Sequence, residues 1–149
     1  MFEHTIYSRV VEINAPREKV WPILLDLKNY SQWNPFTYRV VTTLQIGDPV
    51  DLYVRFKRRG EVVQQEQVRI VQAPERLAWG MKMGADFLLR AQRDQVLTAL
   101  DRNRCSYQTW DAFSGLLTPL VMVLFKQDIE DGFNAMADAL KIRAEALSF

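Results

Sequence analysis

The whole sequence contains one cysteine and one histidine, and this scarcity excludes several kinds of site. Cys105 has no second cysteine for an intramolecular disulfide, which suits a reducing compartment. His4 lies at a chain end, and a single histidine cannot form a two-histidine metal site. Without His4 there is no Ser-His-Asp or Cys-His catalytic set. We therefore expect neither a metal nor a cofactor.

Excess charge and long apolar runs are also missing. The 149 residues include 19 basic and 18 acidic side chains, which gives a formal net charge of +1. Nucleic-acid binding normally needs a basic excess, because it neutralises phosphates. The longest apolar run, 116–125, is interrupted by Thr118 and Pro119 and is too short to span a bilayer. With no signal-peptide pattern at the N-terminus, the sequence predicts a cytoplasmic protein with no nucleic-acid partner and no integral membrane association.

Apolar residues recur with a period of two through much of the chain. Residues 5–13 are strand-like, and short helices are expected from Pro16 to Leu27 and from Asn29 to Pro35. Gly, Pro, Asn and Asp mark the turns between six further predicted strands. These strands are 37–43, 50–57, 62–72, 76–82, 88–100 and 105–113. Their short turns predict sequential antiparallel pairing.

After Phe113 the apolar residues recur every three or four positions, which predicts one long C-terminal helix. We expect Phe133, Met136 and Leu140, in the middle of this stripe, to pack on the sheet. An antiparallel sheet with helices gathered on one face is typical of the α+β class.

Three short motifs carry a resemblance to a known superfamily. They are INAP at 13–16 with the following Val20-Trp21, YSQWNP at 30–35 and FSGLLTPL at 113–120, with Pro74, Leu77 and Trp79 as a weaker fourth. In this order they resemble the START-like and birch-pollen-allergen-like helix-grip superfamily, and most of all its polyketide cyclase/dehydrase-like proteins. The resemblance implies a single ligand-binding domain over 1–149. Its curved antiparallel sheet of six to seven strands would wrap around the long C-terminal helix, with two short helices after the first strand. It implies no particular reaction, because this fold serves many functions.

Several polar residues share the phase of inward-facing apolar residues such as Leu97, Phe113 and Val68. They are Arg93, Gln95, Tyr107, Thr109, Asp111 and Glu66. A buried charge needs a partner, so we expect Arg93 and Asp111 to face the cavity and to touch or nearly touch across neighbouring strands. Paired in this way, Asp111 should stay ionised near neutrality. Two alternatives stay open, namely a bulge at Gln92 that turns Arg93 outward and a purely structural ion pair.

Apolar ligand-binding candidates complete the predicted site. Trp79 and Trp33 are candidates for contact with the ligand. A cluster such as Trp33-Asn34-Pro35 more often plugs one end of a core, with the Asn34 amide bonding loop backbone groups. Leu120 and Leu124 belong to a helix start that is apolar on more than one side. This end covers the cavity mouth, packs in the core or forms a homodimer contact; the sequence does not define the oligomeric state.

The first functional hypothesis is a carrier that binds a lipid-like, aromatic or polyketide-like molecule in a cavity of roughly 300–1,000 Å³. The sequence has no recognisable set of catalytic residues, which favours a carrier over an enzyme. The alternative is a cofactor-independent cyclase, dehydratase or isomerase, with Asp111 or Glu66 as general base and Tyr107 or Arg93 stabilising an enolate. The third is a chaperone-like or assembly-factor protein, which would have a filled core and an exposed apolar patch.

Overall fold

A computed structural model describes residues 2–85 and 87–147, and it confirms the predicted α+β fold. The elements in chain order are β1 (Glu3–Tyr7), β2 (Val11–Ile13), α1 (Arg17–Leu25), the 3-10 helix η1 (Leu27–Gln32), β3 (Thr37–Val41), β4 (Pro49–Phe56), β5 (Gly60–Gln72), β6 (Arg76–Met83), β7 (Leu89–Ala99), β8 (Cys105–Ser114) and α2 (Thr118–Ala146). None of the described helices combines the length and the apolar character that crossing a membrane requires.

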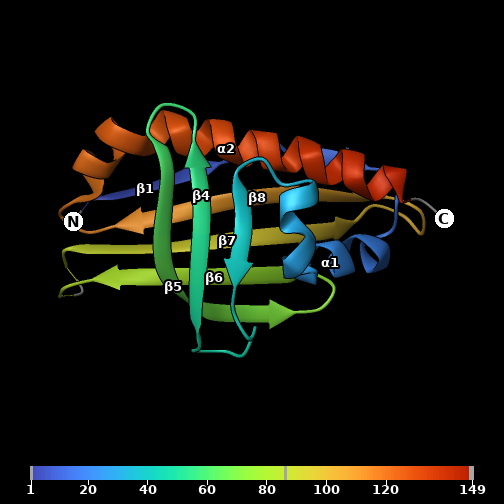
Figure 1. The fold of residues 1–149 in the computed structure, drawn as a ribbon, viewed down its shortest axis with the longest axis horizontal. Coiled ribbons are helices and arrows are strands. Elements are labelled where there is room, and N and C mark those ends of the chain that lie inside the picture. Colours follow the sequence, from blue (N-terminus) through green and yellow to red (C-terminus); the bar gives the residue numbers. More distant parts are fainter. Residues whose placement is uncertain (1, 86, 148–149) are drawn as a thin grey trace.

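All neighbouring strands of the sheet pair antiparallel, in the order β1-β8-β7-β6-β5-β4-β3, and β2 also pairs with β8. Figure 1 shows β4 and the first part of β5 crossing β6, β7 and β8 at a steep angle, while α2 runs lengthwise along the sheet. The interior between the crossed strands and α2 contains both the core and the site described below.

The predicted first strand is wrong in one respect, because it is two strands. β1 and β2 pair with different parts of β8 and are separated at residues 8–10. At this break the Ser8 N–H donates to the Thr109 carbonyl at 2.8 Å, and the Thr109 N–H donates to Ser8 Oγ at 3.1 Å. The next N–H, that of Arg9, donates to Asn134 Oδ1 of α2 at 2.7 Å. A side-chain hydroxyl and a helix residue thus replace ladder hydrogen bonds here.

The loop before β3 is held as the sequence predicts. Asn34 Oδ1 accepts hydrogen bonds from the backbone N–H groups of Phe36 and Thr37, at 3.0 and 2.9 Å. The Phe36 ring then lies directly against Gly132 of α2, where an added Cβ would come within 2.1 Å of the ring. The missing side chain of Gly132 therefore allows this loop to reach the interior.

The middle of α2 confirms the predicted apolar stripe. Phe133, Met136 and Leu140 are 2%, 0% and 0% exposed. They lie in the same apolar core as Leu97 and Tyr107 of the sheet, which are also fully buried.

Candidate functional site

A cavity of about 340 Å³ lies between the sheet and the first half of α2, within the predicted range of volume. Aromatic rings form much of its wall, and they come from the loop before β3 and from β4, β8 and α2. These rings are Phe36, Phe56, Phe113, Phe125 and Phe133. The small side chain of Ala91 on β7 leaves room between them. Most of the wall is therefore suited to an apolar ligand.

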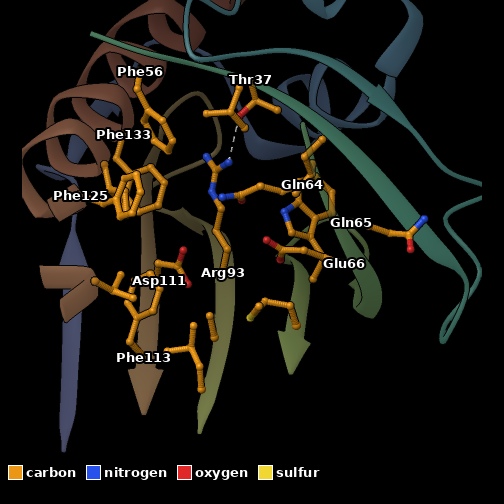
Figure 2. A pocket seen from close by; sticks show the side chains of 18 of the residues that line it. Thr37, Phe56, Gln64, Gln65, Glu66, Arg93, Asp111, Phe113, Phe125 and Phe133 are labelled. Carbon is orange, nitrogen blue, oxygen red and sulfur yellow. Dashed lines mark hydrogen bonds between the residues drawn. The ribbon is translucent and has the colours of Figure 1, made fainter. Parts of the chain in front are cut away.

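Four of the predicted site residues line this cavity, and they come from four strands. Trp79 on β6, Arg93 on β7 and Asp111 on β8 are direct neighbours in one row across the sheet. Glu66 on β5 completes the group. Figure 2 shows the carboxyl groups of Glu66 and Asp111 on either side of the Arg93 side chain, with the guanidinium pointing away from both toward Thr37. The cavity therefore has one polar region on an otherwise apolar wall.

Arg93 and Asp111 are cross-strand neighbours as predicted, but these two described residues do not form the predicted ion pair. Their side chains face the same cavity, but no ion pair joins them in the part of the chain that is described. The Arg93 guanidinium instead donates to Thr109 Oγ1 at 3.1 Å and to Thr37 Oγ1 at 3.3 Å. It also lies 4.6 Å from the centre of the Phe133 ring. The hydroxyls of Thr37 and Thr109 and the ring of Phe133 thus stabilise this cation in place of the Asp111 carboxylate.

Asp111 is left with a buried carboxyl oxygen, Oδ1, that has no hydrogen-bond partner among the described residues. Burial raises the pKa of Asp111 to about 7, although the charge of Arg93 opposes this change. The expectation of an ionised Asp111 at neutral pH is therefore only half right. Near pH 7 the carboxyl group is present in both its protonated and its ionised form.

Glu66 has an even higher pKa. Burial is the main cause, the nearby Asp111 charge adds to it, and Arg93 and Arg69 oppose it, so that the pKa reaches about 8. Most Glu66 side chains are therefore protonated at pH 7. The cavity thus contains two carboxyl groups that lose their protons in adjoining pH ranges.

Trp79 contributes a second polar atom without a partner. Its side chain is 1% exposed and lines the cavity, and its Nε1–H finds no acceptor among the described residues. Buried polar groups in folded proteins are nearly always hydrogen bonded. The indole N–H is therefore available to an acceptor inside the cavity.

Three predicted binding residues do not line the cavity. Tyr107, Gln95 and Thr109 face inward as predicted, but they lie in the filled part of the core and are at most 1% exposed. The Tyr107 hydroxyl donates to Gln95 Oε1 at 2.7 Å, and Thr109 Oγ1 donates to the Asp94 carbonyl at 2.8 Å. The period of two identified the correct face of the strands, but it does not specify the position along them.

The remaining predicted binding residues also lie outside the cavity wall. Leu120 and Leu124 are 55% and 38% exposed, whereas their neighbours Val121 and Phe125 line the cavity. Successive residues of a helix point about 100° apart, so the inward face was placed one position too early. Trp33 packs edge-on against Tyr30, with ring centres 5.2 Å apart, and belongs to the structural alternative.

Sequence reasoning missed the contribution of two loops. Phe36 and Thr37 line the cavity from the start of β3, and only the preceding Asn34-Pro35 turn hinted at an ordered loop. The turn between β4 and β5 docks on α2, where Arg58 donates to Asp128 Oδ1 from its backbone N–H at 3.1 Å. Arg59 Nε donates to the Leu124 carbonyl at 2.9 Å. Among the described residues, no three His, Cys, Asp or Glu side chains gather as metal ligands.

Comparisons with known proteins agree with this fold. The sequence model of a family described as polyketide cyclase / dehydrase and lipid transport matches residues 4–145. No curated protein matches the sequence. Among solved structures, the Zhui aromatase/cyclase from Streptomyces sp. R1128 is 18% identical with a TM-score of 0.77, covering 97% of this chain and 94% of that one.

Two further structures have the same fold. A START superfamily protein from Mycobacterium smegmatis is 20% identical with a TM-score of 0.73, covering 97% of this chain and 99% of that one. Norcoclaurine synthase from Thalictrum flavum, in complex with dopamine and hydroxybenzaldehyde, is 13% identical with a TM-score of 0.72. That match covers 99% of this chain and 90% of the synthase. At these identities the likeness extends to the fold alone.

Proposed function

Because this chain belongs to the polyketide cyclase / dehydrase and lipid transport family, we propose that it binds one hydrophobic small molecule in the cavity under α2. The apolar body of the ligand contacts the aromatic wall. An oxygen-bearing group of the same molecule reaches the polar region, where it accepts a hydrogen bond from Trp79 Nε1–H and exchanges one with the Asp111 carboxyl group.

The observation that carries this proposal is the pair of buried, unpartnered polar atoms, Trp79 Nε1 and Asp111 Oδ1, in a cavity of about 340 Å³. A structural core would leave each of them at a cost of about 1–3 kcal/mol. A ligand whose polar groups reach both atoms would remove this cost. Arg93 also lines the cavity, but its guanidinium already donates to Thr37 and Thr109, so it is not one of the unpartnered groups.

A matched pair of probes tests the polar region. 2-Naphthol and 2-methylnaphthalene have the same ring system and differ by a hydroxyl. The Trp79→Phe variant is expected to weaken 2-naphthol binding about three- to tenfold more than 2-methylnaphthalene binding, because only the hydroxyl loses a hydrogen bond. Titration calorimetry measures both dissociation constants. Trp110→Phe, on the opposite face of β8, is the control and leaves the ratio unchanged.

Failure of both probes to bind the wild-type protein would count against the proposed function itself. Equal weakening of both by Trp79→Phe would count against the role of the indole N–H. Native mass spectrometry of freshly purified protein can identify the class of the natural ligand. We expect any co-purified molecule to carry both an apolar body and at least one oxygen.

A second candidate function, acid–base catalysis, is favoured by the two carboxyl groups with raised pKa values of about 7 and 8. Ionised Asp111 would remove a proton from the carbon next to a ligand carbonyl, while protonated Glu66 would donate its proton to the carbonyl oxygen. The product is the enol, and reversal of both transfers returns the ketone. Tyr107 has no part in this step, because its hydroxyl is bonded to Gln95 outside the cavity.

Hydrogen–deuterium exchange of 2-tetralone in D₂O, followed by NMR, tests this candidate. We expect the exchange rate to rise as Asp111 ionises near pH 7 and to fall as Glu66 ionises near pH 8, which gives a bell-shaped pH profile. Asp111→Asn should abolish catalysed exchange without preventing 2-tetralone binding. Glu61→Gln, an exposed change on the same strand as Glu66, is the control. If 2-tetralone exchanged at the buffer rate in the presence of the wild-type protein, acid–base catalysis would be ruled out and only the binding function would remain.

A further inference from the structure

The sheet is open on one side of the cavity, where β5 and β6 diverge. The pairing of these strands begins at Gln67 and Gly80 and continues away from the cavity to Gln72 and Arg76. On the other side of this point, residues 60–66 of β5 pair with β4. Residues 81–83 of β6 pair with β7. The two strands therefore leave an opening beside Glu66.

An outer pocket adjoins the cavity at this opening. It has a volume of about 460 Å³, and it shares Gln65, Glu66 and Met81 with the cavity wall. Its other lining residues include Gly80 and Lys82, which alternate along β6 with the cavity residues Trp79, Met81 and Met83. Because side chains alternate between the two faces of a strand, this pocket lies on the outer face of the sheet.

The outer pocket is basic. Arg69, Lys82 and Arg90 line it, and Glu66 is the only acidic residue among the lining residues that the structure describes. Lys82 and Arg90 lie directly opposite each other on β6 and β7, so two neighbouring strands supply cations to this pocket. At neutral pH, Glu66 offsets little of this charge, since its pKa of about 8 keeps most of it protonated.

Arg69 is positioned over the opening by two local features. A register shift between Val68 and Ile70 places it in a bulge of β5. Across from it, Gly80 has no side chain, and an added Cβ there would lie 3.4 Å from Arg69 Nε and 2.7 Å from the Ala91 carbonyl oxygen. The guanidinium can therefore approach the backbone of β6 closely, at the boundary between the two pockets.

We propose that the outer pocket binds the anionic end of an amphiphile whose apolar body occupies the cavity. The molecule passes through the opening between β5 and β6 beside Glu66, and its carboxylate or phosphate is bound by Arg69, Lys82 and Arg90. This inference rests on the proposed binding function and narrows its ligand class to anionic amphiphiles. The oxygen-bearing group that contacts Trp79 then lies within the body of the molecule, and the charge lies at its outer end.

Decanoate and 1-decanol test this inference, because they share an alkyl chain and differ in charge. We expect the double variant Arg69→Gln/Arg90→Gln to raise the dissociation constant of decanoate about tenfold and to leave that of 1-decanol unchanged. Raising the salt concentration should weaken decanoate binding to the wild-type protein but not to the double variant. Decyl phosphate, measured in the same way, distinguishes a preference for phosphate from a preference for carboxylate.

The matched control is Arg39→Gln/Arg55→Gln, which removes the same charge from two exposed arginines of β3 and β4 outside the outer pocket. It should leave both dissociation constants unchanged. Equal affinity for decanoate and 1-decanol with no effect of Arg69→Gln/Arg90→Gln would overturn the outer pocket while leaving the cavity function intact. Binding of neither compound, together with no binding of 2-naphthol, would overturn the proposed function and this inference with it.

Discussion

The interior under α2 has two halves that the same elements fill differently. In the packed half, β7, β8 and α2 contribute Leu97, Tyr107 and Leu140, which are 1%, 0% and 0% exposed. In the hollow half, the same strands present Ala91 and Asp111 to a cavity of about 340 Å³. The backbone pairing of β7 with β8 is regular through both halves. Side chains, not backbone, therefore distinguish them.

Hydrogen bonding separates the two halves as clearly as packing does. The Tyr107 hydroxyl in the packed half has its acceptor in Gln95, whereas Asp111 Oδ1 and Trp79 Nε1 in the hollow half have no partner among the described residues. A satisfied polar pair stabilises a fixed core, while unsatisfied groups favour a ligand that completes them. The packed half thus supplies the stability on which the hollow half depends.

The largest expected effect compares one leucine from each half. Leu140→Ala should lower the free energy of unfolding by about 3–5 kcal/mol, because the fully buried side chain leaves a new cavity in a packed region. Leu89→Ala, on the cavity wall, should cost only about 2 kcal/mol, because its side chain already borders the cavity. Urea unfolding measures both, and a cost for Leu89→Ala equal to that for Leu140→Ala would remove the distinction between the halves.

The next effect is the pH dependence of stability in the hollow half. The folded protein holds the Asp111 proton up to about pH 7, whereas an unfolded chain loses it near its ordinary pKa of 3.8. Between these values the folded state binds more protons, so this group makes stability fall as the pH rises. The free energy of unfolding of Asp111→Asn, relative to that of wild type, should therefore rise on the order of 3 kcal/mol from pH 4.5 to pH 8.

Urea unfolding at both pH values checks this prediction. The Asp138→Asn variant, at an exposed carboxylate that pairs with Arg9, is the control and should not show this gain. A difference between Asp111→Asn and wild type that stays constant from pH 4.5 to pH 8 would mean that Asp111 titrates normally and that its environment is wet.

The fold was largely predictable because each element has a local pattern. Alternation around Leu97 and Phe113 identified the inward face of β7 and β8, and the spacing from Phe133 to Leu140 identified the buried stripe of α2. The break between β1 and β2 was not predictable, because it depends on Ser8 bonding to Thr109, about 100 residues away. Contacts of that kind leave no periodic signal in the sequence.

The site was predictable only in part. The alternation of strand residues alone predicted that Glu66, Arg93 and Asp111 share the inner face of the sheet, and all three line the cavity. The period of two could not show that the Arg93 guanidinium turns toward Thr37, because that partner lies at the start of β3, on a strand that is not paired with β7. It also could not show that Tyr107 lies in the filled core and Asp111 at the cavity, since both belong to the same face of one strand.

The smallest expected effect returns to the polar groups of the two halves. Tyr107→Phe removes the donor to Gln95 Oε1 and leaves a buried acceptor unsatisfied, so it should lower the free energy of unfolding by about 1–2 kcal/mol. The loss should be the same at pH 5 and pH 8, because burial raises the Tyr107 pKa to about 12. Asp111→Asn at pH 3, where the carboxyl group is protonated in the folded and in the unfolded chain, should change stability by less than about 0.5 kcal/mol. Both are measured by urea unfolding. If Tyr107→Phe proved as neutral as Asp111→Asn at pH 3, the Tyr107–Gln95 pair would contribute nothing to the packed half, and packing alone would separate it from the hollow one.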